Sequence, residues 1–527
     1  MQLTKRLEKW SRTLLWTNPE GLNRREEGKR AASIVVAAVI LSVASAVGAD
    51  DRSDFVLGEI DRFNPEQSDP RAKEARRLKL CKLAESPWLF YRGTNHLYWA
   101  DFSLNANETH GPDMKNRMNE FGNEHTKIWL QGDLHAENFG AYLDAKGKVV
   151  YGLNDFDESV IADYPYDVWR MAISLVLIAD QNGQLGKKEQ KKVVRKFARA
   201  YLEALESFDG NDNEIRYSFT HSRVGEPLKE FLKDTETEES RVKMLNQQTT
   251  HSASNSKAGK FDRTKPNFCN LPIKNREEQI KEALKAYRHT LADPMIGDDR
   301  FFEVKDIALR VGSGTGGLNA ERYYVLIEGE SPSPEDDRIL DIKEQSAPSA
   351  LQFLTSREKK LYDRLADGNH AKRQMLAYLA LVANPDPLLG WLQLPDGKQF
   401  SVRERSPYKA SFRVLNEEKK DADGTTEIKE TKLNDGKAYE AMAKEWGRIL
   451  AAAHAGSDQD FNPQWIDYSF EKQVAKATDK KKFAELTVQV AMQYAERVVK
   501  DHDLYKASIN QKFRIDCPSE ILIQCPR

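Results

Sequence analysis

The sequence is poor in the features that mark several large classes of protein. Its cysteines are only Cys81, Cys269, Cys517 and Cys525, and none forms a CxxC pair, which argues against a structural zinc site. The formal net charge is −2 and no Arg/Lys stripe is interleaved with aromatics, so no nucleic-acid partner is expected. No tandem repeat is present, and no run after residue 48 is apolar enough to span a membrane. With 527 residues, 40% of them hydrophobic and 31% charged, the chain is typical of a soluble globular protein with a sizeable core.

The two C-terminal cysteines allow two interpretations. Cys517 and Cys525 lie eight residues apart in the tail. In an oxidising compartment they could form a disulfide with each other, or they could remain free thiols. The sequence favours neither outcome.

The N-terminal 50 residues contain one long apolar run. Residues 31–48, AASIVVAAVILSVASAVG, are 18 residues without a charge and could just span a bilayer. Residues 1–30 carry eight Lys/Arg against four Asp/Glu, and this positive side should stay in the cytoplasm. We therefore expect residues 1–50 to be a signal peptide cleaved near Ala46 or Ala49, or an inner-membrane anchor, with the body exported to the periplasm. A buried Ala/Val-rich helix of a cytoplasmic protein is the alternative.

The first half of the body is predicted to be mostly helical around two short strands. Residues 51–128 have helical character, and TKIWLQ and KVVYGL are typical of strands. YPYDVWRMAISLVLIADQ has the periodicity of a buried helix, and KKEQKKVVRKFARAYLEALESF that of a helix solvated on one face. Residues 233–266 are polar and rich in Ser, Thr and Asn, which predicts a long loop.

The pattern changes near residue 301. FFEVKDIALRVGSGTGGLNAERYYVLIEGE and RILDIKEQ alternate apolar and polar residues, which predicts antiparallel strands. A helix around NHAKRQMLAYLALVA follows, and then two more strands, PLLGWLQL and QFSVRER. Residues 411–436 are a charged turn region, after which GKAYEAMAKEWGRILAAAHAGS and the C-terminal part are helical. The fold class predicted from these patterns is α+β.

Polar residues suited to proton transfer and metal binding flank the two early strands. GDLHAENF contains Asp133, His135 and Asn138, and NDFDE contains Asp155 and Asp157. Phosphoryl transfer needs a carboxylate to orient or deprotonate the acceptor hydroxyl, and an amide and a second carboxylate to hold Mg²⁺. The spacing D-x-x-x-x-N, then a short hairpin, then D-F-D supplies these groups. A metal-dependent hydrolase using the same acids is the competing hypothesis.

A glycine-rich stretch, GSGTGG, follows a predicted strand. Gly312, Gly314 and Gly317 fit G-x-G-x-x-G, and Gly316 lies among them. Such a turn lets backbone N–H groups approach phosphate oxygens without a Cβ in the way. A strand follows it rather than a helix, which disfavours a Rossmann site and favours the strand–loop–strand lid that covers ATP phosphates in kinases.

Lys343 lies on the next predicted strand, in ILDIKE. Because side chains alternate along a strand, it should share a face with Asp341 and Ile339. An inward lysine there could pair with the phosphates of a nucleotide, and an ordinary edge-strand lysine is the alternative.

GDLHAENF and NDFDE together resemble the catalytic and metal-binding loops of aminoglycoside phosphotransferases and other protein-kinase-like enzymes. YPYDVWRMA is similar to the helix after those loops, whose aspartate, here Asp167, anchors the catalytic loop. More closely, the chain resembles an uncharacterised bacterial family, domain of unknown function twenty-two fifty-two. The matching stretches run from about residue 75 to 460 and are SPWLFYRG, GDLHAENFG, NDFDE, VGSGTGG, DIKE, GWLQL, FSVRER and WGRILAAAHA.

The order of these motifs implies a circular permutation. In ordinary kinases the glycine-rich strands and their lysine come first, whereas here they follow the catalytic loop by about 180 residues. The resemblance thus implies a two-lobed protein-kinase-like α+β fold that is circularly permuted. Its parts would be the signal or anchor (1–50), the first part of a mostly helical large lobe (51–300), an antiparallel-sheet small lobe (301–410) and the helical second part of the large lobe (411–527).

The resemblance also implies roles for the residues of the two loops. Asp133 would be the catalytic base or hydroxyl-positioning group, and His135 would orient the loop. Asn138 and Asp155 would bind Mg²⁺, with assistance from Asp157.

The nucleotide contacts are implied in the same way. Lys343 would contact the ATP phosphates under the loop of Gly312, Gly314, Gly316 and Gly317. Arg92, in FYRG, is a candidate for the phosphate site or for an ion pair near the catalytic loop.

The expected function is therefore ATP- and Mg²⁺-dependent phosphoryl transfer to a hydroxyl of an unknown, small-molecule acceptor. Two departures keep other hypotheses open. AKRQMLAYLALVA lacks the helix glutamate that kinases pair with the strand lysine, and Glu358 just before it is a weak substitute. That favours a non-catalytic nucleotide-binding pseudokinase as an alternative, with nucleotidyl transfer as another use of the same pocket. An exported protein would also meet little ATP, so the expected function and the expected localisation conflict with each other.

Overall fold

The computed structural model describes residues 52–517 and Cys525, except for residues 67, 104–116, 119, 251–258, 294–299, 313–319 and 421–425. The apolar run 31–48 and the glycines Gly314, Gly316 and Gly317 lie outside the described residues. Within the described part of the chain, no helix combines the length and the apolar character that crossing a membrane requires.

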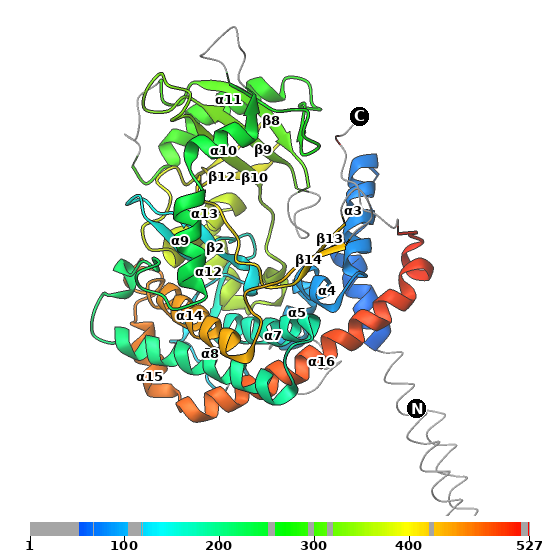
Figure 1. Ribbon diagram of the computed structural model, residues 1–527, viewed down its shortest axis with the longest axis vertical. Coiled ribbons are helices and arrows are strands. Elements are labelled where there is room, and N and C mark those ends of the chain that lie inside the picture. The colour runs from blue at the N-terminus through cyan, green and yellow to red at the C-terminus, as the bar shows by residue number, and fades with distance from the viewer. Residues whose placement is uncertain are drawn as a thin grey trace, which may run out of the picture. The chain divides into compact units, whose positions relative to one another are not determined.

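The largest sheet is antiparallel, with six strands in the order β11-β12-β10-β9-β8-β7 (Figure 1). Its strands are β7 (Phe268–Cys269), β8 (Val304–Arg310), β9 (Arg322–Ile327), β10 (Arg338–Glu344), β11 (Gly390–Gln393) and β12 (Gln399–Glu404). β8, β9 and β10 form a meander, so β10 lies inside the sheet between β9 and β12. The strands predicted after residue 301 are therefore confirmed, and the chain is mixed α+β as predicted.

Helices form much of the rest. In the chain before β8 they include α3 (Pro70–Leu83), α4 (Pro87–Gly93), α5 (Asn95–Phe102), α7 (Pro165–Asn182), α8 (Lys187–Phe208), α9 (Leu228–Glu238), α10 (Arg241–Gln248) and α11 (Arg276–Tyr287). Later come α12 (Ser356–Ala366), α13 (His370–Leu381), α14 (Gly436–Ala455), α15 (Phe470–Ala477) and α16 (Lys480–Phe513). Short 3-10 turns are η1 (Ala136–Asn138), η2 (Glu214–Arg216), η3 (Arg288–Thr290) and η4 (Ser349–Phe353).

The two faces of the large sheet differ in chemistry. Alternation along β10 places Leu340 and Ile342 in the core cluster beneath α11, and Ile339 in a second cluster with residues of α10. Asp341 and Lys343 have the same parity as Ile339, so they belong to the second face, as the alternation predicted. This face is apolar toward α10 and charged further along β10.

Below the sheet in Figure 1, α7, α8, α14 and α16 form the helical core. α7 begins at Pro165, is capped after Asn182 by Gly183 in the left-handed conformation (φ 67°), and is buried on nearly every side. α8 and α14 pack closely because Gly447 has no side chain. A Cβ there would lie 2.6 Å from the Phe197 carbonyl oxygen.

Four two-stranded sheets are also present in the part of the chain that the structure describes. β1 (Lys127–Leu130) pairs with β4 (Val160–Asp163), and β2 (Phe139–Leu143) pairs with β3 (Val149–Leu153). The other two are β5 (Thr249–Thr250) with β6 (Lys260–Phe261), and β13 (Glu417–Lys420) with β14 (Thr426–Lys429). The first two sheets hold the two polar loops of the sequence: GDLHAEN connects β1 to β2, and NDFDES connects β3 to β4.

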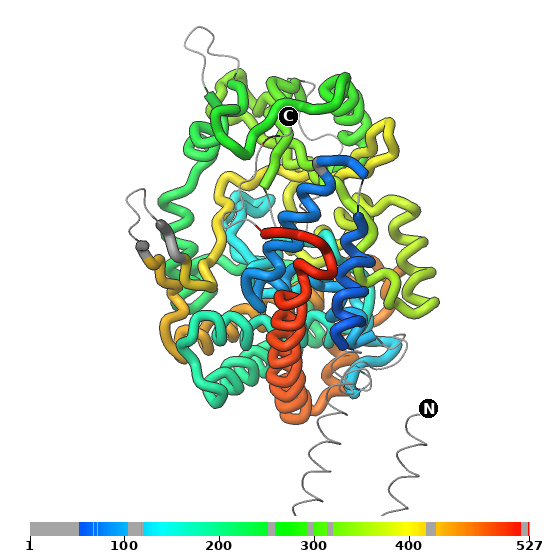
Figure 2. Tube along the Cα trace, turned by 90° about the vertical axis from the view of Figure 1, so that its right-hand side faces the viewer, coloured from blue at the N-terminus to red at the C-terminus, as the bar shows by residue number. Residues whose placement is uncertain are grey.

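The cysteine pairing differs from both interpretations of the tail. Cys517 is bonded to Cys81 of α3, and Cys525 to Cys269 of β7. Cys517 and Cys525 are therefore neither bonded to each other nor free. The cause is the course of α16, which runs beside the N-terminal helices, as the red and blue segments of Figure 2 show. Tyr505 of α16 donates a hydrogen bond to the Leu80 carbonyl (2.7 Å), which brings the tail to Cys81.

Two predictions about irregular segments are wrong in detail. The predicted loop 233–266 contains the end of α9, α10 and strands β5 and β6. The charged turn region 411–436 contains the β13–β14 hairpin. In α10 only Met244 and Leu245 are buried, and two apolar residues in a polar stretch give little periodicity for a sequence pattern to detect.

Candidate active site

The loop after β1 is fixed from below by a buried aspartate. Asp167, in the first turn of α7, accepts hydrogen bonds from the backbone N–H groups of Gln131 (2.7 Å) and Gly132 (3.0 Å). His454 of α14 lies 3.3 Å from the same carboxylate through Nε2, and its Nδ1 is 2.8 Å from the Tyr201 hydroxyl. The loop is thereby attached to both α7 and α14, as the resemblance implied for Asp167.

Gly132 lets this loop press against the second polar loop. It has φ 85°, and a Cβ at this position would lie only 2.0 Å from the Glu158 carbonyl oxygen. A residue with a side chain would be strained by its backbone conformation and would also clash. The close approach brings Asp133 next to the acids of NDFDE.

Asp133 is held by a buried arginine. Arg170 of α7 is fully buried and donates from Nε to Asp133 Oδ1 (2.8 Å), with a second contact from Nη2. Burial raises the pKa of Asp133 to about 7, and the Arg170 guanidinium acts in the opposite direction. A carboxylate with a pKa near neutrality can both accept and release a proton under ordinary conditions.

The rest of the first loop orients Asn138 and His135. Asn138 donates from Nδ2 to the Asp133 carbonyl (2.9 Å), so the amide oxygen is the atom left for a cation. His135 caps η1 by accepting from the Glu137 N–H at Nδ1 (3.2 Å), and burial lowers its pKa well below the usual value. His135 is therefore neutral, which suits a role in shaping the loop.

The second loop carries Asp155 and Asp157 and is fixed through its backbone. Gln131 donates from Nε2 to the Asp155 carbonyl (2.7 Å). Arg373 of α13, fully buried, donates to the carbonyls of Phe156 (3.1 Å), Asp157 (2.8 Å) and Ser159 (3.0 Å). The loop backbone is thus held on both sides, and Asp155 and Asp157 line the cavity described below.

Lys343 of β10 reaches this second loop. Its Nζ forms an ion pair with Asp157, 186 residues earlier in the chain, and Gln345 donates to the other oxygen of Asp157 (2.9 Å). Burial opposes the charged amine, but Asp155 and Asp157 together raise the pKa of Lys343 above its usual value. The chain therefore folds back so that the lysine strand lies against the acids of NDFDE.

Glu358, the residue that the sequence offered as a helix partner for Lys343, has other partners. Glu358 caps α12 with Thr355 and pairs with Lys127 (3.2 Å), so it does not serve Lys343. The contribution of α13 is instead Arg373, which the sequence analysis missed. The resemblance to kinases predicts a glutamate on this helix and so gives no reason to single out Arg373. An arginine within an apolar helical stretch is nevertheless visible in the sequence.

The remaining predicted residues lie at the edge of the site. Arg92 of α4 forms an ion pair with Glu137 of the first loop (2.5 Å between Nη1 and Oε2). Gly312 follows β8 in the left-handed conformation (φ 79°), and the rest of the glycine-rich loop lies outside the described residues.

One cavity of about 1210 Å³ gathers these groups. Its walls include the following predicted residues: Arg92, Asp133, His135, Asn138, Asp155, Asp157 and Lys343. Gly312 is not part of the wall. A cavity of this size is larger than most small-molecule sites, which run from about 300 to 1,000 Å³.

Basic side chains that were not identified from the sequence also line the cavity, among them Arg322, Arg403 and Lys409. Arg322 of β9 donates from Nε to Asp341 Oδ1 (2.6 Å), and Arg403 of β12 donates to the Asn154 carbonyl (2.9 Å). Lys409 follows β12; burial and the nearby Arg322 and Arg403 lower its pKa to about 7. A polyanion entering the cavity would meet these groups as well as Lys343.

Comparison with known proteins identifies one family. The model of a family described as an uncharacterized protein conserved in bacteria, DUF2252, matches residues 71–508. No curated protein and no solved structure matches the chain. The match spans both polar loops, the large sheet, α13 and α14.

Proposed function

The chain belongs to the uncharacterized bacterial family DUF2252, and we propose that it is an ATP- and Mg²⁺-dependent phosphotransferase with a circularly permuted, protein-kinase-like arrangement. The observation that carries the proposal is the ion pair between Lys343 and Asp157. It joins a lysine on the third strand of a meander to an acid that follows a D-x-x-x-x-N loop, and these are the parts that kinases use.

Each part has a chemical role in this proposal. Asn138 and Asp155 supply an amide and a carboxylate oxygen, the ligand type that Mg²⁺ prefers, and Asp157 adds a second carboxylate. Bound Mg²⁺ would neutralise charge on the phosphates. Lys343 would exchange its contact with Asp157 for the nucleotide phosphates, and Arg322 and Arg403 would add positive charge around them.

The proposed reaction is an in-line transfer of the γ-phosphoryl group. The acceptor hydroxyl oxygen forms a bond to the γ-phosphorus while the bond from that phosphorus to the β,γ-bridging oxygen breaks. The bridging oxygen keeps the electron pair and leaves with ADP. Asp133 accepts the hydroxyl proton, and Arg170 holds its carboxylate in place.

A thermal shift experiment with ATP and Mg²⁺ tests nucleotide binding. We expect millimolar ATP–Mg²⁺ to raise the melting temperature by mass action, and Lys343→Met to reduce that shift. Lys285→Met is the matched control, because Lys285 also pairs with a carboxylate but lies on α11 outside the cavity. The proposal fails if no shift occurs with the wild-type protein.

Labelled ATP distinguishes the reactions that one pocket could support. Transfer of the γ-label to an acceptor supports phosphoryl transfer, whereas transfer of the α-label would identify nucleotidyl transfer. Binding without any turnover would favour a pseudokinase. That second candidate is supported by α13, which provides Arg373 to the loop backbone and no acidic partner to Lys343.

A further inference from the structure

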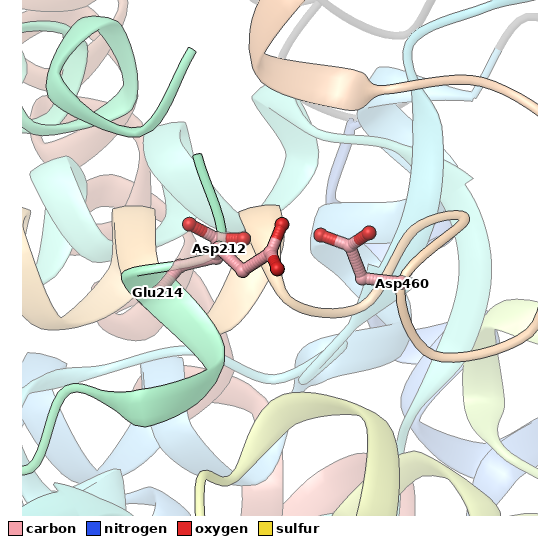
Figure 3. A group of neighbouring side chains, drawn as sticks. All are labelled: Asp212, Glu214 and Asp460. Carbon is pink, nitrogen blue, oxygen red and sulfur yellow. The ribbon is translucent and has the colours of Figure 1, made fainter. Parts of the chain in front are cut away.

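A group of carboxylates lies outside the cavity just described, where η2 meets the segment that follows α14. Asp212 and Glu214 come from the η2 region, and Asp460 comes from the segment after α14. One oxygen of each lies within 4.8 Å of the others. Figure 3 shows the carboxylates of Asp212 and Glu214 facing that of Asp460 across a short gap.

Glu214 is the unusual member of this group. The residue is only 3% exposed, and its Oε2 is buried without a hydrogen-bond partner. A buried carboxylate oxygen with no donor is costly, because the water it lost on folding is not replaced. Asp212 and Asp460 are exposed, so the site opens to solvent on the other side.

Two more acids lie close behind. Asp458 is buried and accepts from the N–H groups of Asp460 (3.0 Å) and Phe470 (2.6 Å), and Glu471 has a buried oxygen without a partner. So many acids in one place favour either a bound proton or a bound cation.

Basic side chains do little to neutralise the group. In the part of the chain that the structure describes, the ion pair made by Asp212, Glu214 or Asp460 is the one from Arg216 to Asp212, at 3.7 Å and on the surface. Neither Glu214 nor Asp460 has a cationic partner there.

We propose that Asp212, Glu214 and Asp460 bind a divalent cation, with Ca²⁺ as the preferred ion. Three carboxylates supply hard oxygen ligands without intervening water, which suits Ca²⁺ better than the strongly hydrated Mg²⁺. Solvent on the Asp212 and Asp460 side would complete the coordination. The bound ion would satisfy Glu214 Oε2 and tie the segment after α8 to the segment after α14.

This location gives the site a structural role. α14 ends at Ala455 and carries His454, which contacts Asp167 beneath the first loop of the cavity. An ion at Asp460 would therefore stabilise the end of the helix that supports that loop. The inference does not depend on the proposed phosphotransferase activity.

Calcium titration of the full chain, stripped of metal with a chelator, tests the site. We expect millimolar Ca²⁺ to raise the melting temperature of the wild-type protein and of Asp155→Asn, which removes an acid of the cavity. Glu214→Gln and Asp460→Asn should lose the calcium response and should melt higher than the wild type in chelator, because each reduces the repulsion among the carboxylates. Asp467→Asn, in the same segment but outside the cluster, should respond as the wild type does.

Two outcomes of the calcium titration would contradict the proposed site. A wild-type melting temperature that ignores Ca²⁺ overturns the proposal, and so does a full response in Asp460→Asn. Because Asp460 is exposed, that variant should fold even if Glu214→Gln does not. Calorimetry with Ca²⁺ on Asp155→Asn should give one site. A response lost in Asp155→Asn would instead assign the calcium to the cavity and leave this cluster without a ligand.

Discussion

At the scale of single residues, the site depends on charged groups removed from water and held by specific partners. Arg170 shows how this is achieved: it lies over the Tyr91 ring (4.3 Å to the centroid) and donates to Asp133. Its charge is satisfied by a carboxylate, a carbonyl and two aromatic faces, so it can remain ionised while buried. Arg170 is therefore a positioning residue for Asp133.

The pKa of Asp133 leads to a pH prediction. The base must be deprotonated to accept a proton, and burial raises its pKa to about 7, so we expect kcat/KM for ATP-dependent turnover to rise as pH increases through about 7. Asp133→Asn should lower kcat by a factor on the order of 100 or more. Steady-state rates between pH 5 and 9 measure both.

Asp163 provides the control for this experiment. Burial also raises its pKa to about 7, but it lies on β4, bonded to Thr126 and away from the cavity wall. Asp163→Asn should keep the rise near pH 7. If Asp133→Asn retains both turnover and the same pH profile, the assigned base is wrong.

At the scale of elements, loops carry the reactive groups and helices and strands hold them. α13 acts on the second loop through one side chain, since Arg373 bonds three backbone carbonyls. The contact between the two loops depends on Gly132. These two residues allow the support of each loop to be tested separately.

Arg373→Ala should destabilise the protein strongly. The carbonyls of Asp157 and Ser159 would lose this donor, whereas that of Phe156 would still accept from Ser159. Each unsatisfied group costs about 1–3 kcal/mol, so we expect a loss of at least about 2 kcal/mol in the free energy of unfolding. Urea denaturation measures it. Arg357→Ala, which removes an exposed ion pair from α12, should cost less than about 1 kcal/mol. Equal effects of the two substitutions would contradict the role given to Arg373.

Gly132→Ala should cost more than Gly147→Ala. Both glycines have positive φ (85° and 71°), so both substitutions carry a backbone strain of about 1–2 kcal/mol. At Gly132 the new Cβ would also clash with the Glu158 carbonyl, whereas at Gly147 nothing lies within 4 Å. The difference between the two free energies of unfolding isolates the clash and should be on the order of 1–3 kcal/mol.

If Gly132→Ala is tolerated as well as Gly147→Ala, the two loops are not in close contact. Turnover is a second readout, because displacing the first loop moves Asp133 relative to Asp155. Loss of turnover at unchanged stability would show that the loop can shift at little cost.

At the scale of the whole molecule, two disulfides join the C-terminal tail to distant parts of the chain. The disulfides link residues separated by 436 and 256 positions and connect the segment after α16 to α3 and to the large sheet. Closing such long loops restricts the unfolded chain, which in the entropic account stabilises the native state by up to about 4–5 kcal/mol for each bond. Disulfides persist in oxidising compartments, so the pairing supports the proposal that the body is exported.

Reduction should therefore lower the melting temperature of the full chain. Peptide mapping without reductant should recover Cys81 linked to Cys517 and Cys269 linked to Cys525. The double variant Cys81→Ser/Cys517→Ser should melt below the wild type under oxidising conditions and respond less to reductant. Recovery of a Cys517–Cys525 peptide, or of four free thiols from an oxidising compartment, would contradict the pairing.

Local pattern was enough to predict much of the architecture. The strands around Lys343 and the helices α7 and α14 were predictable because apolar residues repeat with the period of each element. The α10 helix and the β13–β14 hairpin were missed because their stretches are polar. For the candidate site, the chemical types were visible in GDLHAEN, NDFDE and DIKE. Arg373, Arg322 and Lys409 lie outside the stretches that carry the resemblance, and Arg403 lies in FSVRER, to which the pattern assigned no role.

By itself, the sequence determined the α+β class, the faces of the strands and the acids and amide of the two loops, because these follow from residue type and from short-range periodicity. Only the tertiary structure decided which distant groups meet. Lys343 forms an ion pair with Asp157, and Arg373 donates hydrogen bonds to the loop that contains Asp157. Each C-terminal cysteine forms a disulfide with a cysteine that is distant in the sequence. Such contacts depend on how whole elements pack against one another, and a linear pattern carries no record of that packing.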